Sequence, residues 1–210
     1  MKRVRKFFSK IDINYDVSKR LAFSLLSLWF WWVIANLLNV VIGQLFFLTI
    51  PLFGILQWLV LRRYISHLGW WILASAYAWI GTYLILYVLK VAESIVQILP
   101  QGTLLILGVT VDMQSLWSQL LIVPFVSTVI GIAQWLVLRN RIQYAVWWIF
   151  ANFIGGVARG LAIALVLPIV DPLIGEMIGS LAFTTVTGIA LVGLLKTRIQ
   201  HQLEQQMYWS

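Results

Sequence analysis

Charged residues are scarce in this chain. Only 10% of its 210 residues are Asp, Glu, Lys or Arg, whereas a soluble domain carries about 25%. Hydrophobic residues make up 61%, and the mean hydropathy is +0.92. A water-soluble fold of this length could not bury so much apolar surface. The composition therefore excludes an ordinary soluble domain and predicts an integral membrane protein.

Residues that carry chemistry are also missing. Cysteine is absent, which excludes disulfides and thiolate metal sites. The two histidines, His67 and His201, fall in a basic turn and in the tail, so neither a metal site nor haem is expected inside the membrane. The chain has no glycine-rich phosphate loop, Ser-His-Asp set or His-Glu-x-x-His motif. We therefore expect a non-enzymatic protein, and any cofactor remains unknown.

Long hydrophobic runs are abundant. Each has enough residues to cross a hydrocarbon core of about 30 Å as a helix. The sequence thus predicts an all-α, polytopic bundle with a basic N-terminal segment at 1–20 and a cytoplasmic tail at 196–210. Segment 1–20 could be an interfacial helix or a solvated tail. The six predicted spans are 21–42, 45–61, 69–90, 116–138, 145–167 and 173–195.

The basic residues predict the orientation of these spans. Seven of the fifteen Lys and Arg residues precede span 1, and six more follow spans 2, 4 and 6 (Arg62, Arg63, Arg139, Arg141, Lys196 and Arg198). The other side holds Glu93, Asp112, Asp171 and Glu176, with Lys90 nearby. The positive-inside rule then places both termini in the cytoplasm. The net charge of +8 is a topology signal, and a nucleic-acid partner is not expected.

One stretch of the chain recurs almost unchanged. Residues 54–62 (Gly-Ile-Leu-Gln-Trp-Leu-Val-Leu-Arg) match 131–139 at a displacement of 77, and Trp70-Trp71 matches Trp147-Trp148 at the same displacement. Weaker copies are Trp31-Trp32 in span 1 and Gly188-Ile189-Ala190 in span 6. The economical unit is a hairpin, and three parallel hairpins would supply six spans.

The string Gly-Ile-x-Gln-Trp-Leu-Val-Leu-Arg, with Trp-Trp opening the next span, resembles small uncharacterised multi-pass membrane proteins of cyanobacterial type. The resemblance covers spans 2 to 5 well and the remainder loosely. It implies this fold and a bacterial inner or thylakoid membrane. It implies no catalytic residues.

Polar side chains inside the spans are candidates for packing or binding. Gln57 and Gln134 each precede the terminal arginine of their span by five residues, and Asn36 and Asn152 lie in the Trp-Trp spans. We expect interhelical Gln–Asn hydrogen bonds, with a shared polar pocket as the alternative. The Trp pairs fit an aromatic belt, or a platform for a ring-shaped lipid or pigment.

Arg159 lies near the middle of span 5, where an ionisable residue is costly. Three interpretations compete: an ion pair with Glu176, a site for an anionic ligand or headgroup, and snorkelling. Asp171 is a weaker partner because Asp171-Pro172 resembles a helix start. Gly156-x-x-x-Gly160 and Gly175-x-x-x-Gly179 would let spans 5 and 6 pack closely.

The apolar segment 91–114 is the longest connection. It predicts an interfacial helix followed by a turn, serving either as a cap over the outer end of the bundle or as a passive loop.

Two functions remain open. The first is an accessory, assembly or scaffold subunit of a bacterial membrane complex, whose partners would be the lipid bilayer and another membrane protein. The second is a small-molecule binder or transporter with a site between the hairpins near Arg159. An enclosed polar cavity that reaches Arg159 would distinguish them.

Overall fold

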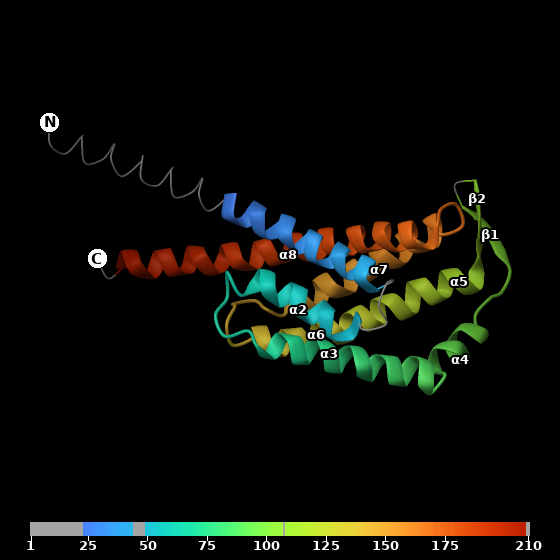
Figure 1. Cartoon of the computed structure of the whole chain (residues 1–210), viewed down its shortest axis with the longest axis horizontal. Coiled ribbons are helices and arrows are strands. Elements are labelled where there is room, and N and C mark those ends of the chain that lie inside the picture. Colours follow the sequence, from blue (N-terminus) through green and yellow to red (C-terminus); the bar gives the residue numbers. More distant parts are fainter. Residues whose placement is uncertain (1–22, 44–48, 107, 209–210) are drawn as a thin grey trace.

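The computed structural model describes residues 23–43, 49–106 and 108–208, which form an elongated helical bundle (Figure 1). Two segments are π-helical. The first, η1 (Leu84–Val88), continues α3 (Trp70–Tyr83), and the second, η2 (Ser118–Ile122), joins α5 (Met113–Trp117) to α6 (Val123–Leu138). The helices are a first helix at Phe23–Gly43, α2 (Thr49–Leu61), α3 (Trp70–Tyr83), α4 (Val91–Gln97), α5 (Met113–Trp117), α6 (Val123–Leu138), α7 (Trp147–Val166) and α8 (Pro172–Tyr208).

Four helices of the described chain are long and apolar enough to cross a membrane: Phe23–Gly43, Met113–Leu138, Trp147–Val166 and Pro172–Ile199. A fifth is obtained when Trp70–Leu86 is joined to Val91–Gln97 across a 52° bend. These long apolar helices agree with the prediction of a helical membrane protein. Of the predicted second span, 45–61, the structure describes α2, which has 13 residues, and residues 45–48 lie outside the described part.

The last helix continues beyond residue 195, where the predicted span 6 ends. The part of α8 that is long and apolar enough to cross a membrane is Pro172–Ile199, and the helix extends to Tyr208 through residues predicted as the tail. The reason is local, since residues 194–208 contain neither glycine nor proline and are rich in Gln and Leu, which are good helix formers. The predicted basic segment 1–20 lies outside the described residues.

The segment 91–114 departs from the all-α prediction. After α4 it forms an antiparallel hairpin of β1 (Thr103–Ile106) and β2 (Val109–Asp112), with Thr103 opposite Asp112. Gly102 and Gly108 adopt positive φ at the entry and the turn, and β-branched residues are frequent in both strands. Val111 packs with Leu116 and Ala164, so the hairpin caps the ends of α5 and α7.

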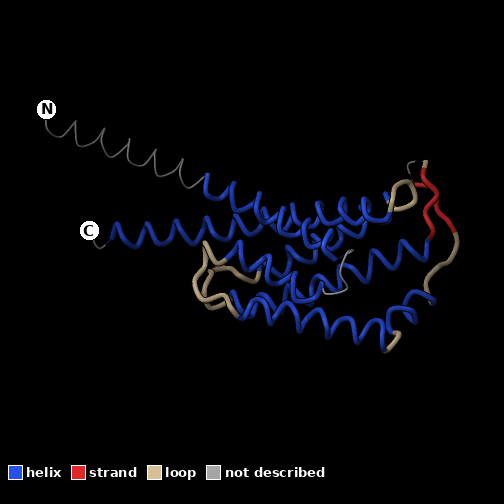
Figure 2. The backbone as a smooth tube through the Cα atoms, viewed as in Figure 1, coloured by secondary structure: helices blue, strands red, loops and turns tan. Residues whose placement is uncertain are grey.

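The two ends of the bundle carry opposite charge. Figures 1 and 2 show the α2–α3 and α6–α7 turns at the end of the bundle where the first helix begins and past which the final turns of α8 extend. We call this the basic end, because those turns hold Arg62, Arg63, Arg139 and Arg141. The hairpin, α4 and the α7–α8 turn lie at the opposite, acidic end, which holds Glu93, Asp112 and Asp171.

Glycines set the spacing around α7, as predicted for Gly175 and Gly179 but not for Gly156 and Gly160. A Cβ on Gly156 would lie 2.7 Å from the Pro124 Cα, and one on Gly160 would collide with the Gln119 carbonyl. The Gly156 and Gly160 faces therefore pack α7 on α6 and η2, not on α8. Close approach of α7 to α8 instead uses Gly155 and Gly179.

Candidate functional site: a polar core and a cavity at Arg159

The two copies of the repeated sequence, 54–71 and 131–148, make equivalent hydrogen bonds inside the bundle. The Trp71 indole Nε1 donates to Gln57 Oε1 at 3.2 Å, and Trp148 Nε1 donates to Gln134 Oε1 at 2.9 Å. All four side chains are at most 2% exposed. Each bond joins the helix that ends in the basic turn to the helix that follows it. Amphipathic indoles buried this deeply require such an acceptor.

The two glutamines are also bonded to each other. Gln134 Nε2 donates to Gln57 Oε1 at 3.1 Å and to Ser75 Oγ at 3.0 Å, while Gln57 Nε2 donates to Asn36 Oδ1 at 2.9 Å. The predicted Gln–Asn bond therefore forms at Gln57. It does not form at Gln134, whose amide donates to Gln57 and Ser75, while the amide of Asn152 donates to the Trp148 carbonyl at 2.8 Å. Ser75 takes the place of a second asparagine.

A third set of contacts joins the first helix to α8. Trp32 Nε1 donates to Thr187 Oγ1 at 3.1 Å, and a Cβ on Gly188 would meet the rings of Trp29 and Trp32. In the same way, Gly54 faces Ser75 and Gly131 faces Asn152. The weak sequence copy around residue 188 thus coincides with a similar glycine contact and a similar indole bond. Thr187 replaces glutamine as the acceptor.

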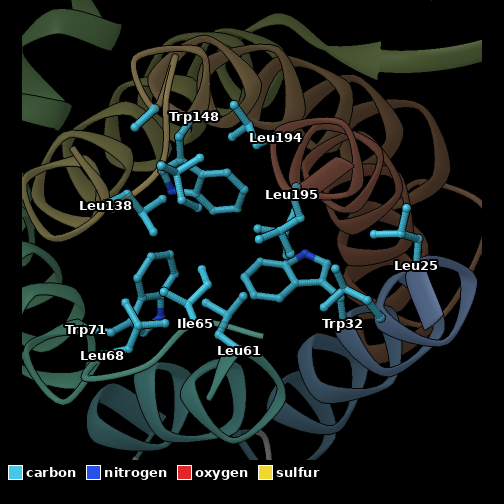
Figure 3. Close-up of a cluster of buried hydrophobic side chains, with 14 residues drawn as sticks. Leu25, Trp32, Leu61, Ile65, Leu68, Trp71, Leu138, Trp148, Leu194 and Leu195 are labelled. Atoms are coloured by element: carbon cyan, nitrogen blue, oxygen red, sulfur yellow. The ribbon is translucent and has the colours of Figure 1, made fainter. Parts of the chain in front are cut away.

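Three indoles converge at the centre of the basic half of the bundle (Figure 3). The ring centroids of Trp32 and Trp148 lie 5.7 Å apart, and those of Trp71 and Trp148 lie 5.9 Å apart. Leucines and isoleucines from the first helix, α2, α6, α8 and the α2–α3 and α6–α7 turns surround them. This half of the bundle is filled by side chains.

Each Trp pair divides between the surface and the core. Trp31, Trp70 and Trp147 are 46%, 71% and 61% exposed, whereas the second Trp of each pair is at most 1% exposed. Consecutive helical residues point about 100° apart, which accounts for the division. The aromatic-belt interpretation fits only the first Trp of each pair, and it is wrong for Trp71 and Trp148.

Beyond the glutamines the bundle opens into a cavity of about 430 Å³. Its lining comes from the first helix, α2, α3, η2, α6, α7 and α8. The polar groups among it are the side chains of Asn39, Gln119, Ser127, Asn152, Arg159 and Glu176. The size falls within the roughly 300–1,000 Å³ of small-molecule sites. A polar cavity therefore reaches Arg159.

Arg159 and Glu176 form the predicted ion pair inside this cavity. Arg159 Nη2 lies 2.6 Å from Glu176 Oε2, and the side chains are 31% and 30% exposed. Gly160 lets α7 approach η2, and Gly179 lets α8 approach α7. Asp171 is not the partner, because its carboxylate accepts the Leu173 backbone N–H at 2.9 Å and caps α8. Both charged groups remain accessible from the cavity.

Asn39 supplies an unused acceptor. Its Oδ1 atom is buried and has no hydrogen-bond partner within the described residues, and its side chain lines the cavity. A buried amide oxygen without a donor is costly. A donor from a molecule in the cavity would remove that cost. Sequence reasoning missed Asn39, although it lies one helical turn after Asn36.

The structure separates the six predicted site residues into two groups. Asn36, Gln57 and Gln134 form the buried polar core, while Arg159 and Glu176 line the cavity. Asn152 lies between them, since it bonds to the Trp148 backbone and also lines the cavity. Among the described residues, no group of three His, Asp or Glu side chains could hold a metal ion. Comparison with family models, curated proteins and solved structures finds no match to this chain.

Proposed function

We propose that the chain crosses a bacterial inner or thylakoid membrane six times, with both termini in the cytoplasm. The charge difference between the two ends of the bundle supports this orientation, since Arg62, Arg63, Arg139 and Arg141 lie at the basic end. In the sequence, seven more Lys and Arg residues precede the first helix. The resemblance to cyanobacterial-type membrane proteins supports the location.

We further propose that the six spans form three related units. The three indole bonds support pairing α2 with α3, α6 with α7, and α8 with the first helix. This pairing shifts the boundaries of the hairpins expected from the sequence by one helix. The three units then close into a ring, because the last helix of the chain contacts the first.

We infer that the protein is a non-enzymatic binding or transport protein for a small zwitterionic solute. The observation that carries this inference is the cavity that the Arg159–Glu176 pair lines. The pair is neutral overall, and no other ionisable side chain lines the cavity among the described residues. A solute with a net charge would enter without compensation, which is costly in a low-dielectric site. A zwitterion can place its carboxylate on Arg159 and its ammonium on Glu176.

Ligand-dependent thermal stability tests this function. The purified protein would be heated with each of the twenty amino acids and with glycine betaine, and unfolding would be followed by the fluorescence of its twelve tryptophans. A ligand at 100 times its dissociation constant stabilises by about 2.7 kcal/mol, so a rise of several degrees is expected for at least one zwitterion. Amides and N-acetyl derivatives of that compound, which lack one charge, should not produce it. No shift from any zwitterion would contradict the proposal.

The accessory or scaffold function is the second candidate. The observation that favours it is the C-terminal part of α8, which projects past the other described helices at the basic end (Figure 1). A rigid arm of this kind suits docking to a partner subunit. A stoichiometric protein partner that stays bound in mild detergent, and is lost when the chain is truncated after Arg198, would support this candidate.

A further inference from the structure

Two grooves on the outside of the bundle have walls built from matching positions. The larger groove, of about 710 Å³, lies between α3 and α6, and the smaller, of about 210 Å³, lies between the first helix and α2. The wall residues Trp70, Leu73, Ala74 and Tyr77 correspond to Trp31, Ile34, Ala35 and Leu38, and Ala133, Leu136 and Val137 correspond to Leu56, Leu59 and Val60. Corresponding residues of the repeats therefore form a groove at two places on the surface of the bundle.

One substitution between the copies widens the larger groove. Leu56 in the smaller groove is replaced by Ala133 in the larger one, while Leu73 matches Ile34 in size and Tyr77 is larger than Leu38. The larger groove also has Ala78, Asn140 and His67 in its lining. On the α3 wall, Ala74 and Ala78 have small side chains that occupy little of the groove.

One end of each groove is basic and the rest is apolar. His67, Asn140 and Arg141 line the larger groove at the basic end of the bundle, and Arg63 and Tyr64 line the smaller one. The Arg141 side chain is fixed there, because its Nη1 donates to the Ser66 carbonyl at 2.8 Å. A guanidinium carries five N–H donors, so others remain available for an anion. The exposed Trp70 lies in the same wall, and Trp favours the headgroup layer.

We propose that the groove between α3 and α6 is a binding site for an anionic glycerophospholipid. The phosphate and headgroup bind at Arg141 and His67, and one acyl chain lies along Leu73, Ala133 and Leu136. The combination of a cationic mouth with a long apolar groove matches the charge and the shape of such a lipid. This inference rests on the proposed membrane placement, and it is independent of solute binding in the cavity.

Native mass spectrometry of the delipidated protein tests the site. Dioleoyl phosphatidylglycerol is the anionic probe, and dioleoyl phosphatidylcholine is the zwitterionic control. We expect one phosphatidylglycerol to be retained under conditions that remove phosphatidylcholine. Ala133→Leu should weaken this binding at least about tenfold, because the leucine side chain narrows the groove where the acyl chain is proposed to lie. Leucine already occupies the matching position 56, so the variant should fold.

Two further variants make the test specific. Leu56→Ala should enlarge the smaller groove and add a second phosphatidylglycerol. Arg141→Gln should abolish the preference for phosphatidylglycerol over phosphatidylcholine while leaving the groove open. Equal binding of both lipids by the wild type would overturn the proposal, as would unchanged phosphatidylglycerol binding by Ala133→Leu. Thermal shifts by zwitterions should be unaffected in all three variants, which separates this site from the cavity.

Discussion

Replacing Gln134 by leucine lowers the free energy of unfolding by about 2–4 kcal/mol. The change removes the acceptor of the Trp148 indole and the donor to Gln57 and Ser75. A buried donor left without a partner costs about 1–3 kcal/mol, and an interhelical hydrogen bond in a membrane bundle is worth about 0.6 kcal/mol on average. Leucine is close to glutamine in size, and Leu191 follows Gly188 by three residues, as Gln134 follows Gly131. We therefore expect the loss to come from the hydrogen bonds and not from a change in side-chain size. Reversible unfolding in mixed detergent micelles measures the change.

A double-mutant cycle separates the hydrogen bond from packing. Trp148→Phe removes the orphaned N–H, so adding it to Gln134→Leu should restore part of the lost stability. Gln97→Ala is the control, because that side chain is exposed and bonds only to Glu93 among the described residues, at 3.3 Å. It should change stability by less than about 0.5 kcal/mol. If Gln134→Leu behaved like Gln97→Ala, the polar core would not hold the bundle together.

Neutralising Arg159 alone should destabilise the protein, whereas neutralising both members of the ion pair should not. Arg159→Met leaves the Glu176 carboxylate without its partner inside the bundle. A fully buried pair would then cost about 3–5 kcal/mol, and because the two side chains are about 30% exposed we expect about 1–3 kcal/mol. Arg159→Met combined with Glu176→Gln should recover most of that loss.

The same double variant distinguishes a structural ion pair from a binding site. It is expected to unfold at nearly the wild-type temperature, but the stabilisation by zwitterions should disappear because neither charge remains. The measurement is the thermal shift described above, carried out on both proteins in parallel. A double variant that retained the full shift would place the solute elsewhere.

Much of the core was predictable because it depends on local pattern. The apolar spans predicted helices, and the recurrence of residues 54–62 at 131–139 marked Gln57 and Gln134 as a pair. Depth in span 5, together with the short α7–α8 turn, was enough to predict the Arg159–Glu176 contact. Arg159 and Glu176 lie on helices that are consecutive in the chain, where spacing limits the choice of partner. Gln57 and Gln134 are 77 residues apart, and only the structure shows that they bond to each other.

Features that depend on which faces meet were not predictable. Trp71 and Trp148 follow basic turns, which is also where interface residues occur, so their position alone did not indicate the core. Gly156 and Gly160 could serve either neighbour of α7, and only the structure shows that they face α6 and η2. The cavity arises from several helices together, so no single segment encodes it. The hairpin at 103–112 was hidden by its short length and apolar composition.

Solvent access to Asn39 tests most directly whether the polar cavity at Arg159 can be entered by solute. The chain has no native cysteine, so Asn39→Cys introduces a unique thiol for a membrane-impermeant methanethiosulfonate. Ser94→Cys and Ser66→Cys are exposed controls for the acidic and basic ends, and Ala145→Cys is the buried control. The account predicts that Asn39→Cys reacts from the same side as Ser94→Cys. Reaction no faster than that of Ala145→Cys, or only from the side of Ser66→Cys, would contradict it.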